Sequence, residues 1–135
     1  MISKRAPYVF SHASKGMTIF MKNRALEFYE NDCNCSQCIL KAAQACLNTA
    51  IPNESIKMCA GLGDGFGVSK MCGALIAGVM VLSAAYEGTE LKRARLRLLD
   101  GFKSEFSHYD CGQLKTKFDC EDIIATVCDL LEKLL

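Results

Sequence analysis

The 135-residue sequence has almost no excess of charge of either sign. Sixteen lysines and arginines are balanced by fifteen aspartates and glutamates, which gives a formal net charge of +1. Such a balance creates no general attraction to nucleic acid or to anionic lipid, so we expect neither as a partner. The basic run of residues 92–97 is interrupted by Ala94 and Leu96. It is spread around one predicted helix, which is typical of a solvated face.

The sequence also lacks a hydrophobic run long enough to cross a membrane. Residues 71–86 are apolar apart from Ser83, whereas a spanning helix needs about 20 apolar residues. No signal peptide is visible at the N-terminus, so we expect a cytoplasmic protein. Cysteines in that compartment are kept mostly reduced.

No segment alternates in hydrophobicity strongly enough to indicate a β-strand, whereas helical periodicity recurs along the chain. The pattern predicts an all-α fold, a single-domain bundle with a buried central helix at about residues 70–87. Residues 1–15 show no clear period and are expected to form an N-terminal arm, followed by a cysteine-rich domain over 16–135. The other expected helices are 16–30, 35–48, 90–108 and 120–134, with short helices or turns at 56–62 and 110–118.

Cysteine is the residue that the sequence has in excess. There are nine, and an odd number cannot pair completely within one chain. Three cysteines follow a residue that often caps helices, and a polar or acidic residue comes two positions after each cysteine. They occur in the pairs Asn34-Cys35, Asp110-Cys111 and Asp119-Cys120. Cys72 fits the same idea, because it follows Ser69 by three positions.

Cysteines at helix starts are candidates for chemistry. The helix dipole and the free backbone N–H groups there stabilise a thiolate, which binds soft metals and attacks disulfides. Helix starts can converge at one end of a bundle, so a site with four sulfurs is geometrically feasible. It would hold an iron–sulfur cluster or zinc, or form two redox-active pairs. The four candidates are Cys35, Cys72, Cys111 and Cys120.

The remaining cysteines fall into two groups. Cys33 and Cys38 form a C-x-C-x-x-C string with Cys35, which can hold a metal or a disulfide, so we treat them as secondary candidates for metal ligands. Cys46, Cys59 and Cys128 are interpreted as small core residues, since free cysteine is among the most buried residue types.

Alternate glycines precede Cys72, in residues 61–67. The run lacks the Gly-Lys-Ser/Thr ending of a P-loop and no strand precedes it, which argues against a nucleotide site. We expect it to allow close backbone approach beside Cys72, with Gly65, Gly67 and Gly73 as candidate cofactor contacts.

The order of these features resembles a known family, the C_GCAxxG_C_C proteins described as redox-active. The resemblance covers about residues 25–130. The matching parts are Asn34-Cys35-Ser36-Gln37, the glycine-rich stretch into Cys72-Gly73-Ala74-Leu75-Ile76-Ala77-Gly78, Cys111-Gly112-Gln113-Leu114, and Cys120. The literal family string places Gly before the cysteine and two residues between Ala and Gly. Here Gly73 follows Cys72, and three residues separate Ala74 from Gly78.

The resemblance implies a helical redox protein whose functional sulfurs are the four cysteines chosen above. A similar helical domain occurs in split-Soret type cytochromes, where a cysteine-bound iron–sulfur centre has been considered. This chain has no C-x-x-C-H string, so haem attachment does not carry over.

Three functions remain open at this point. The first is an iron–sulfur protein that exchanges electrons with a protein partner. The second is a metal-free thiol–disulfide oxidoreductase in which Cys72, near Lys70, attacks. The third is a helical interaction protein stabilised by zinc. Whether the protein is an enzyme, and whether it forms a homo-oligomer, is left open.

Overall fold

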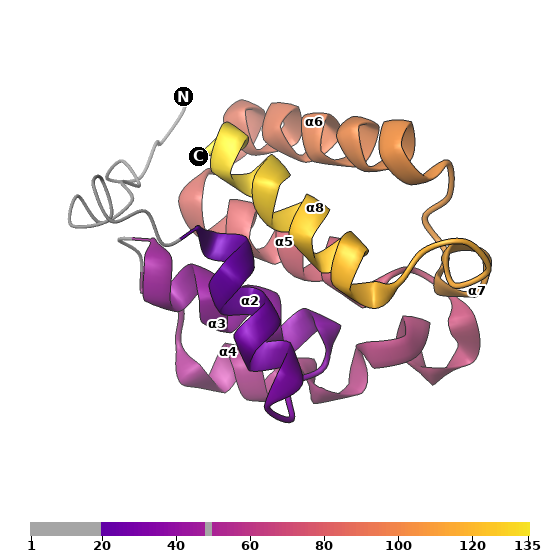
Figure 1. The fold of residues 1–135 in the computed structure, drawn as a ribbon. Coiled ribbons are helices and arrows are strands. Elements are labelled where there is room, and N and C mark those ends of the chain that lie inside the picture. The colour runs from indigo at the N-terminus through magenta and orange to yellow at the C-terminus, as the bar shows by residue number, and fades with distance from the viewer. Residues whose placement is uncertain (1–19, 48–49) are drawn as a thin grey trace.

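The computed structural model describes residues 20–47 and 50–135, and within these ranges the chain forms helices and turns without a β-strand (Figure 1). The all-α prediction is confirmed. The expected arm at 1–15 and the first residues of the expected helix 16–30 lie outside the described residues. No helix in the described part is long and apolar enough to cross a membrane. The helices are α2 (Met21–Glu30), α3 (Cys35–Cys46), α4 (Asn53–Met58), α5 (Gly73–Ala85), α6 (Gly88–Phe106), α7 (Cys111–Leu114) and α8 (Cys120–Leu134).

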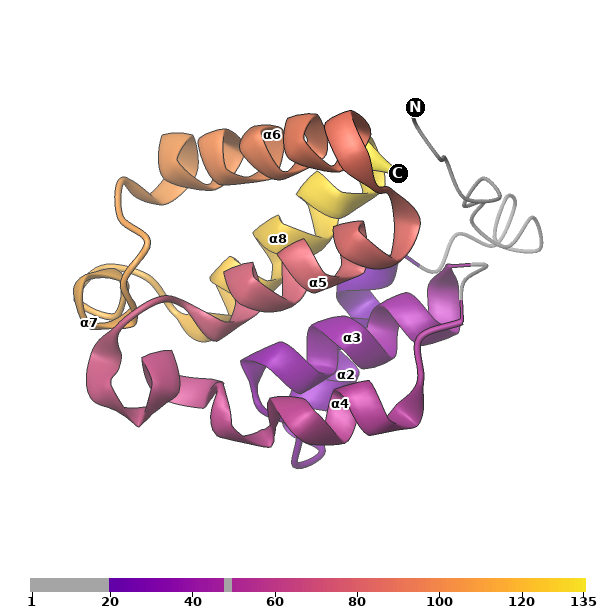
Figure 2. The same cartoon turned by 180° about the vertical axis from the view of Figure 1, so that it is seen from behind.

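Helix α5 is the buried centre that the sequence predicts. It packs against α3, α6 and α8 (Figure 2), and its apolar side chains leave no polar face to turn toward water. The helix is shorter than the expected range 70–87. It begins at Gly73 because Lys70 and Cys72 have non-helical backbone angles and hydrogen-bond to the segment that leads into α7. It ends where Tyr86 becomes extended.

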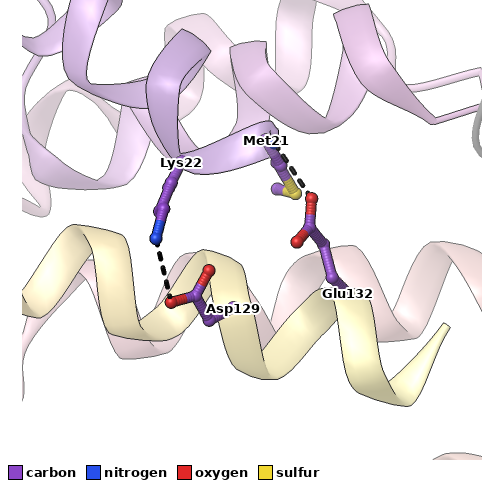
Figure 3. A network of polar contacts seen from close by, with 4 residues as sticks. All are labelled: Met21, Lys22, Asp129 and Glu132. Carbon is purple, nitrogen blue, oxygen red and sulfur yellow. Dashed lines mark hydrogen bonds and ion pairs between the residues drawn. The ribbon is translucent and has the colours of Figure 1, made fainter. Parts of the chain in front are cut away.

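The first turn of α2 is held by the last turns of α8 (Figure 3). The backbone N–H of Met21 donates to the Glu132 carboxylate at 3.0 Å, and Lys22 lies 3.6 Å from Asp129. The residue before α2, Phe20, supplies no side-chain cap. Glu132 therefore satisfies an N–H group that the helix itself leaves free.

Helices begin at Cys35, Cys111 and Cys120, as the three capping patterns predict, but only the first of these helices has its predicted side-chain cap. The Asn34 side chain accepts from the backbone N–H groups of Ser36 and Gln37, and the Gln37 side chain accepts from the Asn34 N–H. This complete capping box stabilises the start of α3 by about 1 kcal/mol. Asp110 and Asp119 precede α7 and α8 as expected, yet neither side chain makes a capping hydrogen bond.

Helices α3 and α5 are in tight contact at Gly73. The buried Ser36 hydroxyl donates to the Gly73 carbonyl at 2.8 Å. A Cβ atom on Gly73 would lie 2.5 Å from the Ser36 Oγ and 2.6 Å from the Leu62 carbonyl oxygen. Real Cβ atoms do not come this close to other heavy atoms, so only glycine allows the observed distance between the two helix starts.

Two of the three cysteines interpreted as core residues are almost fully buried. Cys128 is 0% exposed and Cys59 1% exposed, and the Cys59 thiol donates to the Ser55 carbonyl at 3.2 Å. Cys46 is half-buried and packs against the core. Cys38, a secondary metal candidate, is 0% exposed as well. Burial raises the pKa of the Cys38 and Cys128 thiols, because a thiolate loses its hydration there.

The close approach at Gly73 predicts a clear effect of one methyl group. We expect Gly73→Ala to lower the free energy of unfolding by about 1–3 kcal/mol, because backbone must shift to make room. The matched control is Gly61→Ala, where the added Cβ meets nothing within 4 Å, so stability should change by less than about 0.5 kcal/mol. Urea unfolding of both variants measures the difference. Equal stability of the two would contradict the close approach.

The buried thiols predict a loss of stability at alkaline pH. A thiol whose pKa is raised in the folded protein keeps its proton there while the unfolded chain loses it. The free energy of unfolding of the metal-free protein should therefore fall as pH rises above about 8.5, the ordinary thiol value. Cys128→Ala should make the slope between pH 9 and 10.5 less steep, by up to about 1.4 kcal/mol per pH unit. Urea midpoints across this pH range measure it, and an unchanged slope would refute the assignment to Cys128.

Candidate functional site

All four cysteines predicted at helix starts line one pocket, which has a volume of about 150 Å³. The pocket lies where α3, α5 and α8 begin, next to α7 and the glycine-rich segment, which gather at one end of the bundle (Figure 2). The four sulfur-bearing residues are Cys35, Cys72, Cys111 and Cys120. The other lining residues are Tyr29, Asn34, Gly63, Asp64, Gly73, Ala74, Leu114, Lys115 and Ile123.

Cys35 is placed by the capped start of α3. It is the first residue of that helix, directly after the Asn34 cap. The Asn34 amide also donates to the carbonyls of Cys59 and Ala60, at 3.0 and 3.1 Å, which ties this helix start to the segment before the glycine-rich run. A Cβ on Gly73 would lie 3.0 Å from the Cys35 sulfur. The sulfur is therefore packed directly against the start of α5.

Cys72 and Cys111 are brought together by backbone pairing of the segments that precede α5 and α7. Met71 and Asp110 form an isolated antiparallel bridge. The Cys72 N–H donates to the Tyr109 carbonyl at 2.9 Å, and the Cys111 N–H donates to the Lys70 carbonyl at 2.7 Å. The two cysteines thus enter the pocket from adjacent backbone segments, although 39 positions separate them in the printed sequence.

Cys120 is the first residue of α8 and faces Tyr29 of α2. Burial, together with a hydrogen bond to the Cys120 sulfur, raises the pKa of the Tyr29 hydroxyl. The sequence indicates Tyr29 only as one apolar position of an amphipathic helix. Its role at the pocket depends on how α2 packs beside α8, which no local pattern reveals.

The glycine-rich segment reaches the pocket through a left-handed turn. Asp64, Gly65, Phe66 and Gly67 all have positive φ, from 55° to 75°. Such a conformation costs a residue other than glycine of order 1–3 kcal/mol. The turn brings the Asp64 backbone to the Cys35 sulfur and its carboxylate to within 2.5 Å of the Lys115 ammonium. Both side chains were missed by the sequence analysis, because neither belongs to a cysteine motif.

The electrostatics of three thiols correct the expectation that helix starts hold them as thiolates. Burial raises the pKa of Cys35 and Cys111, and it raises that of Cys72 to about 11. The backbone N–H groups of Ala74 and Leu75 act in the opposite direction at Cys72. Backbone N–H groups therefore stabilise the Cys72 thiolate, as predicted. In the metal-free protein, however, the loss of hydration on burial has the larger effect on the pKa of this thiol.

Several other predicted residues lie elsewhere. Cys33 does not line the pocket, and the Cys38 thiol donates to the Cys35 carbonyl at 3.3 Å within the core. Gly73 lines the pocket, whereas Gly65 and Gly67 do not. Gly65 instead lets the turn fold against the Lys70 backbone, which a Cβ would strike.

The pocket cation is also different from the one expected. Lys70, considered as an activator of Cys72, is exposed and contributes no side chain to the lining. The cation in the pocket wall is Lys115, which lies beside Cys111. Its charge lowers the pKa of the Cys111 thiol and so opposes the larger effect of burial.

The donor atoms around the pocket are not drawn together at one point. In the described part of the chain, no group of three or more His, Cys, Asp or Glu side chains is arranged to hold a metal ion. A single zinc ion would need its sulfur ligands about 2.3 Å away. The four cysteines instead surround a cavity whose volume is comparable to that of cavities known to bind a ring of six carbons.

Comparison with known proteins gives one match. The model of the family described as "Putative redox-active protein (C_GCAxxG_C_C)" matches residues 33–134, which include all four pocket cysteines. The match does not bear on split-Soret type cytochromes, so that similarity stays a prediction. Neither the curated proteins nor the solved structures contain a significant match. Because the family model matches about three quarters of the sequence, the chain belongs to the C_GCAxxG_C_C family.

Proposed function

We propose that the pocket binds an iron–sulfur cluster through Cys35, Cys72, Cys111 and Cys120, and that the protein transfers electrons to and from a protein partner. The observation that carries the proposal is the arrangement of four cysteines, from four separate helix starts, around one cavity. When bound, such a cluster supplies one-electron redox chemistry. Four cysteine ligands are the usual set for it.

The shape of the cavity favours a cluster over a single ion. The cysteines line a space of about 150 Å³, and a group of several atoms fills such a space better than one zinc ion. A polynuclear group has its cysteine sulfurs spread around it, whereas a single ion draws them to one point. A zinc-stabilised interaction protein is therefore a weaker candidate than a redox protein.

The surroundings of the sulfurs also fit a cluster. The backbone N–H groups of Ala74 and Leu75 act on Cys72, and the Asp64 backbone acts on Cys35. Hydrogen bonds to cysteine sulfurs are one of the means by which proteins tune iron–sulfur clusters. Apolar residues, Leu114 and Ile123 among them, form part of the pocket wall.

A metal-free thiol–disulfide reaction is the second candidate, and one observation favours it. Lys115 lowers the pKa of the Cys111 thiol, which helps the sulfur to act as a nucleophile. In that case we expect Cys111, and not Cys72, to attack, because burial raises the pKa of Cys72 to about 11.

Iron binding is tested on protein purified without oxygen. We expect iron and acid-labile sulfide in the wild type, with a visible absorption band that bleaches on reduction. Cys→Ser at each of the four pocket cysteines should weaken iron binding by at least about tenfold, since loss of even an outer-shell partner costs a metal site that much.

Cys46→Ser is the matched control, because Cys46 is half-buried and does not line the pocket. It should keep the iron content of the wild type. Iron-free, colourless wild-type protein from this preparation would contradict the proposal. So would equal losses of iron in the control and in the pocket variants.

A further inference from the structure

The cysteine pocket has one charged pair in its wall. Among its lining residues in the described part of the chain, Lys115 is the one cation and Asp64 the one carboxylate. The Lys115 ammonium lies 2.5 Å from the Asp64 carboxylate oxygen, and both side chains are partly exposed, at 46% and 74%. Neither residue belongs to the cysteine motifs, so nothing in the cluster proposal assigns them a task.

Lys115 is held close to Cys111 by the backbone. Its N–H donates to the Cys111 carbonyl at 2.9 Å, which closes the helical turn after α7. Residues four apart on such a turn share a face, so the ammonium and the Cys111 sulfur are neighbours. Lysine has an ordinary pKa of about 10.4, so this side chain is positively charged at neutral pH, and its ammonium donates a hydrogen bond to Asp64.

Asp64 is held independently, by the left-handed turn. Its φ is 55°, a conformation that aspartate and asparagine tolerate better than most residues. The turn fixes the carboxylate near Lys115 without any contribution from α7. Two elements distant in the sequence thus place opposite charges at the same pocket.

We propose that Lys115 sets the reduction potential of the cysteine pocket and that Asp64 offsets part of its charge. The inference rests on the redox role proposed above. Lys115 is a positioning residue, since it acts through the Cys111 sulfur.

The electron balance gives the sign of the effect. A reduced protein partner loses one electron and the pocket gains it, so the charge of the pocket becomes more negative by one. No bond forms or breaks at Lys115, and Lys115 gives up no proton. A nearby cation stabilises the more negative state, and a nearby anion destabilises it.

The test uses three variants of the full-length, iron-loaded protein and measures the midpoint potential of each. Lys115→Met should lower the potential, with about a threefold decrease in the equilibrium constant for reduction, as expected for a partly exposed charge. Asp64→Asn should raise the potential, because it frees the Lys115 charge while keeping a residue suited to positive φ. Lys117→Met removes the same charge from an exposed position outside the pocket lining and should change the potential much less.

Opposite shifts in the first two variants support the proposal, since a purely structural disturbance has no reason to change sign with charge. Equal shifts in Lys115→Met and Lys117→Met overturn it, because the effect is then one of overall charge. Shifts of the same sign in Lys115→Met and Asp64→Asn overturn it as well. Both of these results leave iron binding intact, so they do not count against the cluster.

Failure of the cluster proposal is seen separately, as iron-free wild-type protein. Without a cluster, burial raises the pKa of the Cys35, Cys72 and Cys111 thiols, so they keep their protons at neutral pH. Reduction of a disulfide to two such thiols adds two protons with the two electrons and leaves the charge of the pocket unchanged. Iron-free wild-type protein therefore overturns the inference together with the cluster, whereas the two results above overturn the inference alone.

Discussion

The contact between the starts of α3 and α5 is the constraint on which the pocket depends. The Ser36 hydroxyl binds the Gly73 carbonyl, and the missing side chain of Gly73 leaves the space that Ser36, Leu62 and the Cys35 sulfur occupy. If the two helices moved apart here, Cys35 and Cys72 would no longer line the same cavity. The other contacts around the pocket extend this arrangement, because they add α7 and α8 to a pair of helix starts already in place.

A second constraint is the competition between burial and hydrogen bonding at the sulfurs. Loss of hydration raises the pKa of Cys35, Cys72 and Cys111, while backbone N–H groups and the Lys115 charge lower it. In the metal-free protein burial dominates, so these sulfurs hold their protons at neutral pH. Metal binding must release those protons, because only thiolates are ligands, and it is therefore coupled to pH. The N–H groups and Lys115 reduce the cost of that release.

The sequence predicted the parts of the fold that depend on local patterns. Hydrophobic periodicity gave the helices, and the Asn34 capping box located the start of α3 to the residue. The same reasoning identified the four helix-start cysteines, and their order added the family resemblance. Capping failed at Asp110 and Asp119, where the residue type was right but the side chain makes no capping bond. The rotamer that each aspartate side chain adopts depends on neighbouring residues in the folded protein, which the local sequence does not specify.

The sequence did not predict the residues that complete the pocket. Tyr29 reaches it because α2 packs beside α8, and Asp64 reaches it through four consecutive left-handed residues. Both positions depend on tertiary packing, which local sequence patterns do not reveal. Phe66 even adopts a positive φ, a conformation that its residue type disfavours. Lys70 was favoured as the activating cation because it is close to Cys72 in sequence. In the structure, the lysine that lies beside a pocket cysteine is Lys115, and its neighbour is Cys111.

The most direct measurement is a map of which thiols lie together in the metal-free protein. A short reagent that links two thiols, followed by mass spectrometry of the digested protein, identifies each linked pair. The account predicts links among Cys35, Cys72, Cys111 and Cys120, and none from these residues to Cys46. Links that join the pocket cysteines mainly to Cys46, or to each other only between separate molecules, would contradict the convergence of the four helix starts.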